Sequence, residues 1–220
     1  MKISTDTIKI LQNFATINSN IHIRPGSEIS TLGPQKNIFA KATVAENFPK
    51  DFCIYDLGSL LSLLTLMDNQ DIEFGDTSLK ISKDGGEFEY FYADESVIIA
   101  PEAGKSIPID NHYQFKVSGT DVIMLNKAAA VVGAKFISVV SSKGKVVLSV
   151  GDPKTAGSNS YRRILGECDK DFNCRLAVEN FKAMAGEPYT VTISKKKFFH
   201  FKHETTALEY WFAMEPDSVV

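Results

Sequence analysis

The chain has 220 residues, of which 44% are hydrophobic, 10% aromatic and 23% charged. This length suits one large domain or two of about 110 residues, and the composition excludes a disordered or fibrous chain. No apolar run approaches the roughly 18 residues of a membrane helix, so we expect no membrane protein. Three cysteines without a CxxC pair, and an N-terminus without an apolar signal segment, favour a reducing cytoplasm.

Charge is unevenly divided along the chain, whose net charge is −3. Residues 1–110 hold 9 basic and 16 acidic side chains, and residues 111–220 hold 15 and 11, which gives −7 and +4. Proteins that grip phosphates are usually basic, so the overall charge argues mildly against such binding. The opposite charges of the halves fit head-to-tail association of subunits and equally fit chance variation of the surface.

The first half is predicted to contain two helices among short strands. Over Ser4–Asn18 the apolar residues recur at helical spacing, and Ser4 is a suitable N-cap. A second helix is expected over Leu57–Met67, with small uncharged residues on its polar side. Strands, several joined by Asp- and Gly-rich turns, are expected at Ile21–Arg24, Ile38–Val44, Phe52–Tyr55, Asp71–Phe74, Leu79–Ser82, Phe88–Tyr92 and Val97–Ile99.

The order of elements restarts after a segment with two prolines and a glycine, Ala100–Tyr113. Lys116-Val117-Ser118 resembles Lys2-Ile3-Ser4, and the same offset places Leu125 over Leu11. Helices are expected over Thr120–Val132 and Glu179–Ala185. Strands are expected at Phe136–Val140, Val146–Val150, Leu176–Val178, Tyr189–Ser194, Phe198–Lys202 and Leu208–Met214.

We therefore predict an α+β fold made of two similar domains, each with antiparallel sheets and two helices. The N-terminal domain is expected over residues 1–105 and the C-terminal domain over residues 114–220. Residues 106–113 are expected to connect them.

No motif predicts a catalytic residue, a metal site or a cofactor. Ala103-Gly104-Lys105-Ser106 resembles the end of a P-loop, but Ile99 stands where a P-loop needs glycine, and Pro108 interrupts the helix that should follow. His200 and His203 lie three residues apart on a predicted strand and so point to opposite faces. We expect a protein that is not an enzyme.

Several short segments occur in an order that is typical of one family. Phe14-Ala15-Thr16-Ile17-Asn18-Ser19 closes the first predicted helix, and Ile54-Tyr55-Asp56-Leu57 opens the second. Val97 to Pro101 and Ile107-Pro108 follow the same pattern. Together they resemble the DNA polymerase sliding clamps of T-even-type bacteriophages. The second half is similar mainly in the order and length of its elements.

The resemblance implies a DNA clamp fold and a homotrimer whose six domains form a closed ring, with helices lining the hole. It implies a replicative sliding clamp that encircles duplex DNA without sequence preference and makes the DNA polymerase processive by binding its C-terminal peptide. The implied partners also include an ATP-driven clamp loader and a sigma-like factor of late transcription. The implied location is the cytoplasm of the infected bacterial host.

The size of the ring can be checked against this expectation. Twelve helices about 10 Å apart make a circle about 38 Å across, which leaves a hole of about 28 Å after subtracting a helix diameter. A DNA duplex is roughly 20 Å wide, whereas eight helices would leave only about 15 Å. Subunits of two domains must therefore form trimers to encircle DNA.

This arrangement assigns a sparse set of polar helix residues to the DNA side. They are Lys9, Gln12, Asn13, Thr16, Asn126, Lys127 and Lys182. Such a lining would make weak phosphate contacts that exchange readily, although the same residues would also suit an ordinary solvated helix face. Ile123 and Ala130 depart from the pattern, because they fall on the expected polar side of the third helix.

The partner-peptide pocket is expected near the connector, as the resemblance implies. Its candidate residues are Ile107, Pro108 and Ile109, together with Tyr210 and Phe212 of the last strand. Plain core packing would explain the same apolar residues.

Two other functions stay open at this point. A non-catalytic phage accessory protein that does not encircle DNA would be a monomer or a dimer. An enzyme built on the acidic clusters would need metal and would lose activity on substitution of one carboxylate.

Overall fold

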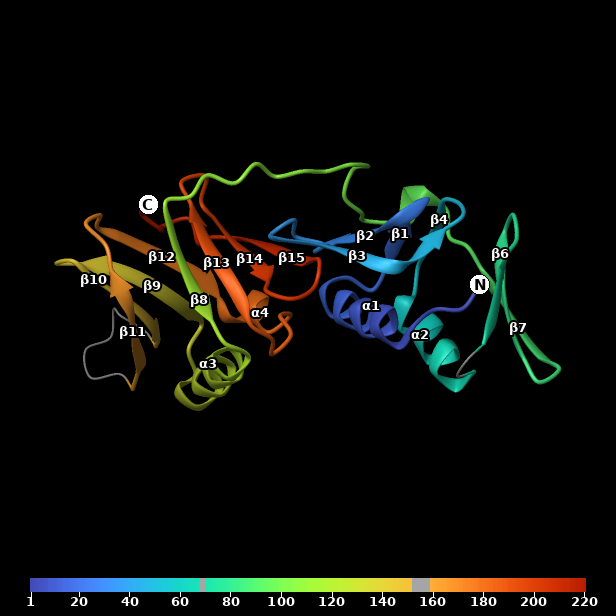
Figure 1. Ribbon diagram of the computed structural model, residues 1–220, viewed down its shortest axis with the longest axis horizontal. Coiled ribbons are helices and arrows are strands. Elements are labelled where there is room, and N and C mark those ends of the chain that lie inside the picture. The colour runs from blue at the N-terminus through green and yellow to red at the C-terminus, as the bar shows by residue number, and fades with distance from the viewer. Residues whose placement is uncertain (68–69, 152–158) are drawn as a thin grey trace. The chain divides into compact units, whose positions relative to one another are not determined.

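The computed structural model describes residues 1–67, 70–151 and 159–220, which divide into two compact units, Met1–Ser106 and Ile107–Val220. In the described residues each unit contains a helix, four strands, a second helix and three strands, and unit 2 begins with one further strand (Figure 1). All strand pairings within the units are antiparallel. The predicted α+β class is confirmed. The unit boundary falls inside the segment 106–113.

Unit 1 packs two helices against antiparallel strands (Figure 1). Its elements are α1 (Thr5–Ile17), β1 (Ile21–Ile23), β2 (Gly26–Leu32), β3 (Ile38–Phe48), β4 (Phe52–Ile54), α2 (Leu57–Leu66), β5 (Asp71–Phe74), β6 (Ser78–Lys83), β7 (Gly86–Phe91) and a 3₁₀ helix, η1 (Glu95–Val97). β1 pairs with β4, β2 pairs with β3, and β5, β6 and β7 form a meander. Phe14, Ile54 and Leu57 are buried where the helices meet the strands.

Unit 2 contains two sets of four hydrogen-bonded strands. Its elements are β8 (Tyr113–Val117), α3 (Gly119–Val132), β9 (Phe136–Ser142), β10 (Lys145–Val150), β11 (Tyr161–Glu167), β12 (Phe172–Ala177), α4 (Val178–Phe181), β13 (Tyr189–Ser194), β14 (Phe198–His203) and β15 (Leu208–Ala213). One set pairs in the order β11-β10-β9-β12, and the other in the order β15-β14-β13-β8. Val122, Leu125 and Ala129 form the buried stripe of α3.

Side-chain caps determine where the three longer helices begin. The Ser4 side chain accepts from Thr7 N in α1, and the Asp56 side chain accepts from Ser59 N in α2. Ser118 opens α3, which ends at Gly133 with a φ of 63°, a conformation that glycine adopts without strain. The observed bounds differ by one residue at most from the predicted helices at these ends.

Five elements differ from the prediction. Val97–Ile99 is not a strand, because Asp94 caps the short helix η1 there and no strand follows it. The strands β2 and β11 were not expected, because Gly and charged residues obscure their alternation. Strand β8 does alternate, but it begins at Tyr113, the last residue of the segment with two prolines and a glycine that was expected to be the linker. α4 is a single turn rather than Glu179–Ala185, because Ala183 N and Met184 N bond carbonyls only three residues back.

Candidate nucleic-acid interface

The exposed side of α1 carries three of the predicted DNA-facing residues. Lys9, Gln12 and Thr16 are exposed, and Asn13 is half-buried. The Lys9 Nζ atom lies 3.1 Å from Asp6 Oδ1, and both side chains are mostly exposed. Lys9 therefore presents its charge next to a carboxylate, which weakens its attraction for phosphate.

α1 and α2 form an uncharged groove of about 600 Å³. Gln12 and Ala15 line it from α1, and Gly58, Ser62 and Thr65 are among its residues from α2. The hydroxyls of Ser62 and Thr65 donate to carbonyls of their own helix, at 2.9 and 2.8 Å. Small side chains keep the groove open. Of the two α1 residues that line it, Gln12 supplies a polar group, its side-chain amide. The sequence indicated these residue types but not that the two helices form a groove.

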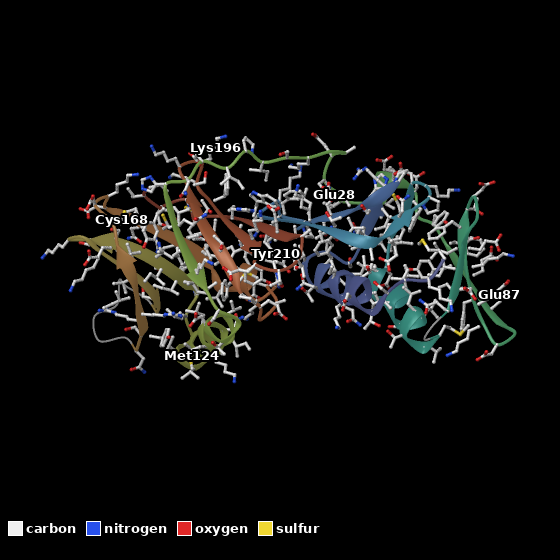
Figure 2. All side chains as sticks on the ribbon, in the orientation of Figure 1. Glu28, Glu87, Met124, Cys168, Lys196 and Tyr210 are labelled. Atoms are coloured by element: carbon white, nitrogen blue, oxygen red, sulfur yellow. The ribbon has the colours of Figure 1, made fainter. Side chains whose placement is uncertain are left out.

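The exposed side of α3 is more apolar than a DNA-facing surface would need. Lys127 is exposed, but Ile123, Met124 and Val131 are exposed as well, and Met124 lies on the side turned away from the strands (Figure 2). Asn126 is half-buried, and its Oδ1 atom is buried without a hydrogen-bond partner in the part of the chain that the structure describes.

α4 places Lys182 at its C-terminal end, exposed and 3.1 Å from Glu179 Oε2. Two of the three predicted lysines therefore have an acidic neighbour on their own helix. Lys127 has no ion pair among the described residues. Of the three lysines, only Lys127 therefore presents a charge that no neighbouring carboxylate in the described part of the chain offsets.

The N-termini of α1 and α3 are each held to a strand by a carboxylate. Glu46 of β3 accepts hydrogen bonds from Ser4 N and from the Thr7 hydroxyl. Burial by itself would raise the pKa of Glu46, but these hydrogen bonds hold it below its ordinary value. In α3, Asp121 pairs with Arg163 of β11, and its pKa is lowered by Arg163 and Ser118 in spite of burial.

The predicted peptide-pocket residues separate into two groups in unit 2. Pro108 and Ile109 are exposed and Ile107 is half-buried. Tyr210 and Phe212 are 0% exposed, and their rings stack with centroids 5.8 Å apart. Both belong to the core of unit 2, because alternation along β15 points them inward. The exposed residues of the expected pocket are therefore confined to the connector.

Neither a metal site nor a membrane helix is found in the described residues. No group of three or more His, Cys, Asp or Glu side chains there could hold a metal ion. None of the helices described combines the length and the apolar content that crossing a bilayer requires.

Comparison with known proteins decides the family. Residues 4–100 match the family described as DNA polymerase processivity factor. The sliding clamp of Vibrio phage KVP40 is 31% identical over 222 residues, which cover 98% of this chain and 99% of that one. The chain belongs to the sliding clamp family. The sliding clamp of Enterobacteria phage T4 is 29% identical over 227 residues, covering 99% of this chain and 98% of that clamp.

The fold of this sliding clamp extends beyond phages. The proliferating cellular nuclear antigen of Entamoeba histolytica aligns with a TM-score of 0.68 at 14% identity, covering 95% of this chain and 94% of that one. The clamp is thus a phage replicative processivity factor, a class of accessory rather than catalytic proteins. The predicted family and clamp fold are confirmed.

Proposed function

We propose that three copies of this clamp close into a ring of six domains that encircles duplex DNA and tethers the DNA polymerase by its C-terminal peptide. An ATP-driven loader opens the ring, and a sigma-like factor of late transcription also binds it. The ring acts in the cytoplasm of the infected host and performs no chemistry of its own. The similarity to phage sliding clamps along the whole chain supports this proposal.

The observation that carries the ring proposal is a pair of unlike strand edges. β7 is the last strand of the β5-β6-β7 meander, and β11 is the last strand of the β11-β10-β9-β12 set. β7 exposes Glu87, Glu89 and Phe91. β11 exposes Arg162, Ile164 and, at its C-terminal end, Glu167, and its two arginines leave it net basic. An acidic and apolar edge therefore has a basic and apolar counterpart on the same chain.

Unlike edges favour a head-to-tail contact, which closes into a ring when the rotation between subunits permits it. An exposed strand edge with large apolar side chains promotes aggregation unless another strand or element packs against it. Phe91 is 65% exposed and Ile164 is 68% exposed within the single chain. Edge-to-edge pairing of β7 with β11 of the next copy would bury both.

Light scattering over a dilution series tests the ring. We expect a mass of about 73 kDa, three times the 24.3 kDa of the chain. Phe91→Asp and Ile164→Asp should both give monomers at micromolar concentration, since each places a charge in the strand contact. Val131→Asp, at a residue of α3 that is 86% exposed, is the matched control and should stay trimeric.

A dimer in the wild type would contradict the ring, and trimers in both edge variants would contradict the pairing of β7 with β11. Retention on circular DNA and loss on linearised DNA then tests encirclement directly. For the polymerase peptide, Ile109→Glu should weaken binding to the trimer without changing its mass, because this side chain is exposed.

A further inference from the structure

A polar cavity of about 170 Å³ lies in unit 1, apart from the helix faces and the strand edges discussed above. Its lining includes His22 of β1, Arg24 of the following turn, Ser30 of β2 and Lys105 of the segment after η1. Ligand pockets for drug-sized molecules measure about 300–1,000 Å³, so this cavity is too small for a nucleoside. It suits a group of the size of one amino-acid side chain.

The cavity opens on the side of β1 that faces away from α1 and α2. Ile21 and Ile23 share one interior cavity with Leu11 and Leu57, which belong to those helices. Because side chains alternate along a strand, His22 between them points to the opposite side. A duplex held by the helices of the ring would therefore not reach this cavity.

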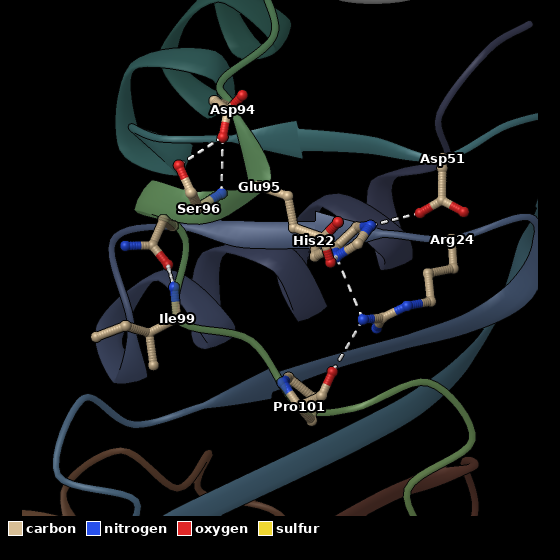
Figure 3. A network of polar contacts seen from close by, with 9 residues as sticks. His22, Arg24, Asp51, Asp94, Glu95, Ser96, Ile99 and Pro101 are labelled. Carbon is tan, nitrogen blue, oxygen red and sulfur yellow. Dashed lines mark hydrogen bonds and ion pairs between the residues drawn. The ribbon is translucent and has the colours of Figure 1, made fainter.

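A chain of hydrogen bonds holds Arg24 in place (Figure 3). Its Nη2 atom donates to His22 Nδ1 at 3.2 Å and to the Pro101 carbonyl at 3.0 Å. Since a guanidinium only donates, His22 accepts at Nδ1 and donates from Nε2 to Asp51. The Nε and Nη1 atoms of Arg24 make no hydrogen bond within the described residues, which leaves their N–H groups as single donors for a ligand.

A turn brings a second cation to the cavity. Lys105 N donates to the Glu102 carbonyl at 3.2 Å, and Gly104 has a φ of +65°, which glycine adopts without strain. The Lys105 side chain is half-buried and has no ion pair in the described ranges. Gly104 and Lys105, which resembled the end of a P-loop in the sequence, thus line this cavity instead. The Ser30 hydroxyl adds a neutral donor.

We propose that this cavity binds a single carboxylate from a peptide of a partner protein. A free N–H group of Arg24 and the Lys105 ammonium can each donate to one oxygen of a carboxylate, so the two cations share the group between them. Glu28, which lies 3.7 Å from Lys41, and Glu102 also line the cavity. These acids oppose any anion, and they oppose a polyanion such as DNA more strongly than a single carboxylate; they can also accept hydrogen bonds from the N–H groups of a peptide.

The inference rests on the proposed role of the clamp as a platform for partner proteins, but its test does not need a closed ring. The probes are a capped tripeptide with one central aspartate, its asparagine counterpart, inorganic phosphate and a short DNA duplex. The readout is the NMR shift of the Gly104 and Lys105 amides in the full chain. We expect saturable shifts with the aspartate peptide only.

Two variants and a control sharpen the result. Lys105→Gln should lower the affinity for the aspartate peptide roughly tenfold, which is the typical loss for one charge-assisted hydrogen bond. Arg24→Lys keeps the charge, removes the Nε and Nη1 donors of the guanidinium and should weaken binding at least as much. Lys36→Gln, at an exposed lysine outside the cavity, should bind like the wild type.

Several outcomes would overturn the proposal. They are equal shifts with the asparagine peptide, equal or larger shifts with phosphate or the duplex, no shifts at all, and unchanged affinity in Lys105→Gln. The mass of each variant is measured in parallel. A clamp that binds the aspartate peptide as a monomer would leave this site intact and contradict only the ring.

Discussion

The first helices of the two units, α1 and α3, meet the same physical problem with opposite placements of charge. Each begins with free N–H groups and is capped by a serine, Ser4 or Ser118. In unit 1 the carboxylate that completes the cap comes from a strand, as Glu46 of β3. In unit 2 it comes from the helix itself, as Asp121, and the strand β11 supplies Arg163.

This difference teaches that the repeat preserves geometry rather than residue types. β3 and β11 are both the third strand after the first helix of their unit, yet one faces it with an acid and the other with a base. The residues that precede the first helix of each unit also keep their backbone pairing. In unit 1, Met1 exchanges two hydrogen bonds with Ile72 of β5, and in unit 2, β8 pairs with β13. Backbone pairing is repeated, and the side chains around it have diverged.

The largest expected effect tests whether the two helices contribute equally to their cores. Leu11 and Leu125, which the repeat superimposes, are 3% and 2% exposed. Leu11→Ala and Leu125→Ala should each lower the free energy of unfolding by about 2–5 kcal/mol, because each leaves a cavity. Chemical denaturation measures the loss. A value below about 1 kcal/mol in either variant would show that this unit repacks, and Val131→Ala is the exposed control.

A smaller effect distinguishes the two caps. Glu46→Gln should destabilise unit 1 by about 2 kcal/mol, since the hydrogen bonds to this buried carboxylate are charge-assisted. Asp121→Asn should lower the free energy of unfolding by less than Glu46→Gln, because Asp121 and Arg163 are partly exposed.

The direction of the Glu46 pKa shift predicts how the stability of the protein changes with pH. The folded pKa of Glu46 lies below its ordinary value of 4.5, so its contribution is complete above about pH 4.5 and is lost as the pH falls through the folded pKa. Glu46→Gln should therefore flatten the fall in stability with acid in urea titrations between about pH 5 and 3. An unchanged acid slope would contradict the role of this carboxylate.

The smallest effect concerns the helix lysines. Lys9→Gln and Lys182→Gln each break an exposed pair worth about 0.3–0.5 kcal/mol and should leave stability nearly unchanged. In DNA binding, Lys127→Gln should lower the slope of log affinity against log salt by about 0.9, as expected for one lost phosphate contact. Lys9→Gln should lower it less, because Asp6 offsets its charge. Equal slopes for all variants would contradict a DNA-facing role for Lys127.

Local patterns predicted much of the fold. α1, α2 and α3 follow from apolar residues at helical spacing behind a capping side chain. β5 and β13 have the predicted bounds, since both alternate and are delimited by turns. β2 and β11 escaped prediction because they contain Gly and charged residues, so that only pairing with β3 and β10 makes them strands.

The sequence by itself determined the fold class and the internal repeat, because helix period, caps and strand alternation depend on neighbouring residues. The family followed from the resemblance of short segments to those of known clamps. Tertiary structure alone decided that Tyr210 is core and that α1 and α2 leave a groove. It also decided that Arg24 meets the Pro101 carbonyl, 77 residues away along the chain. Contacts of that range depend on how whole elements pack, and no local pattern specifies them.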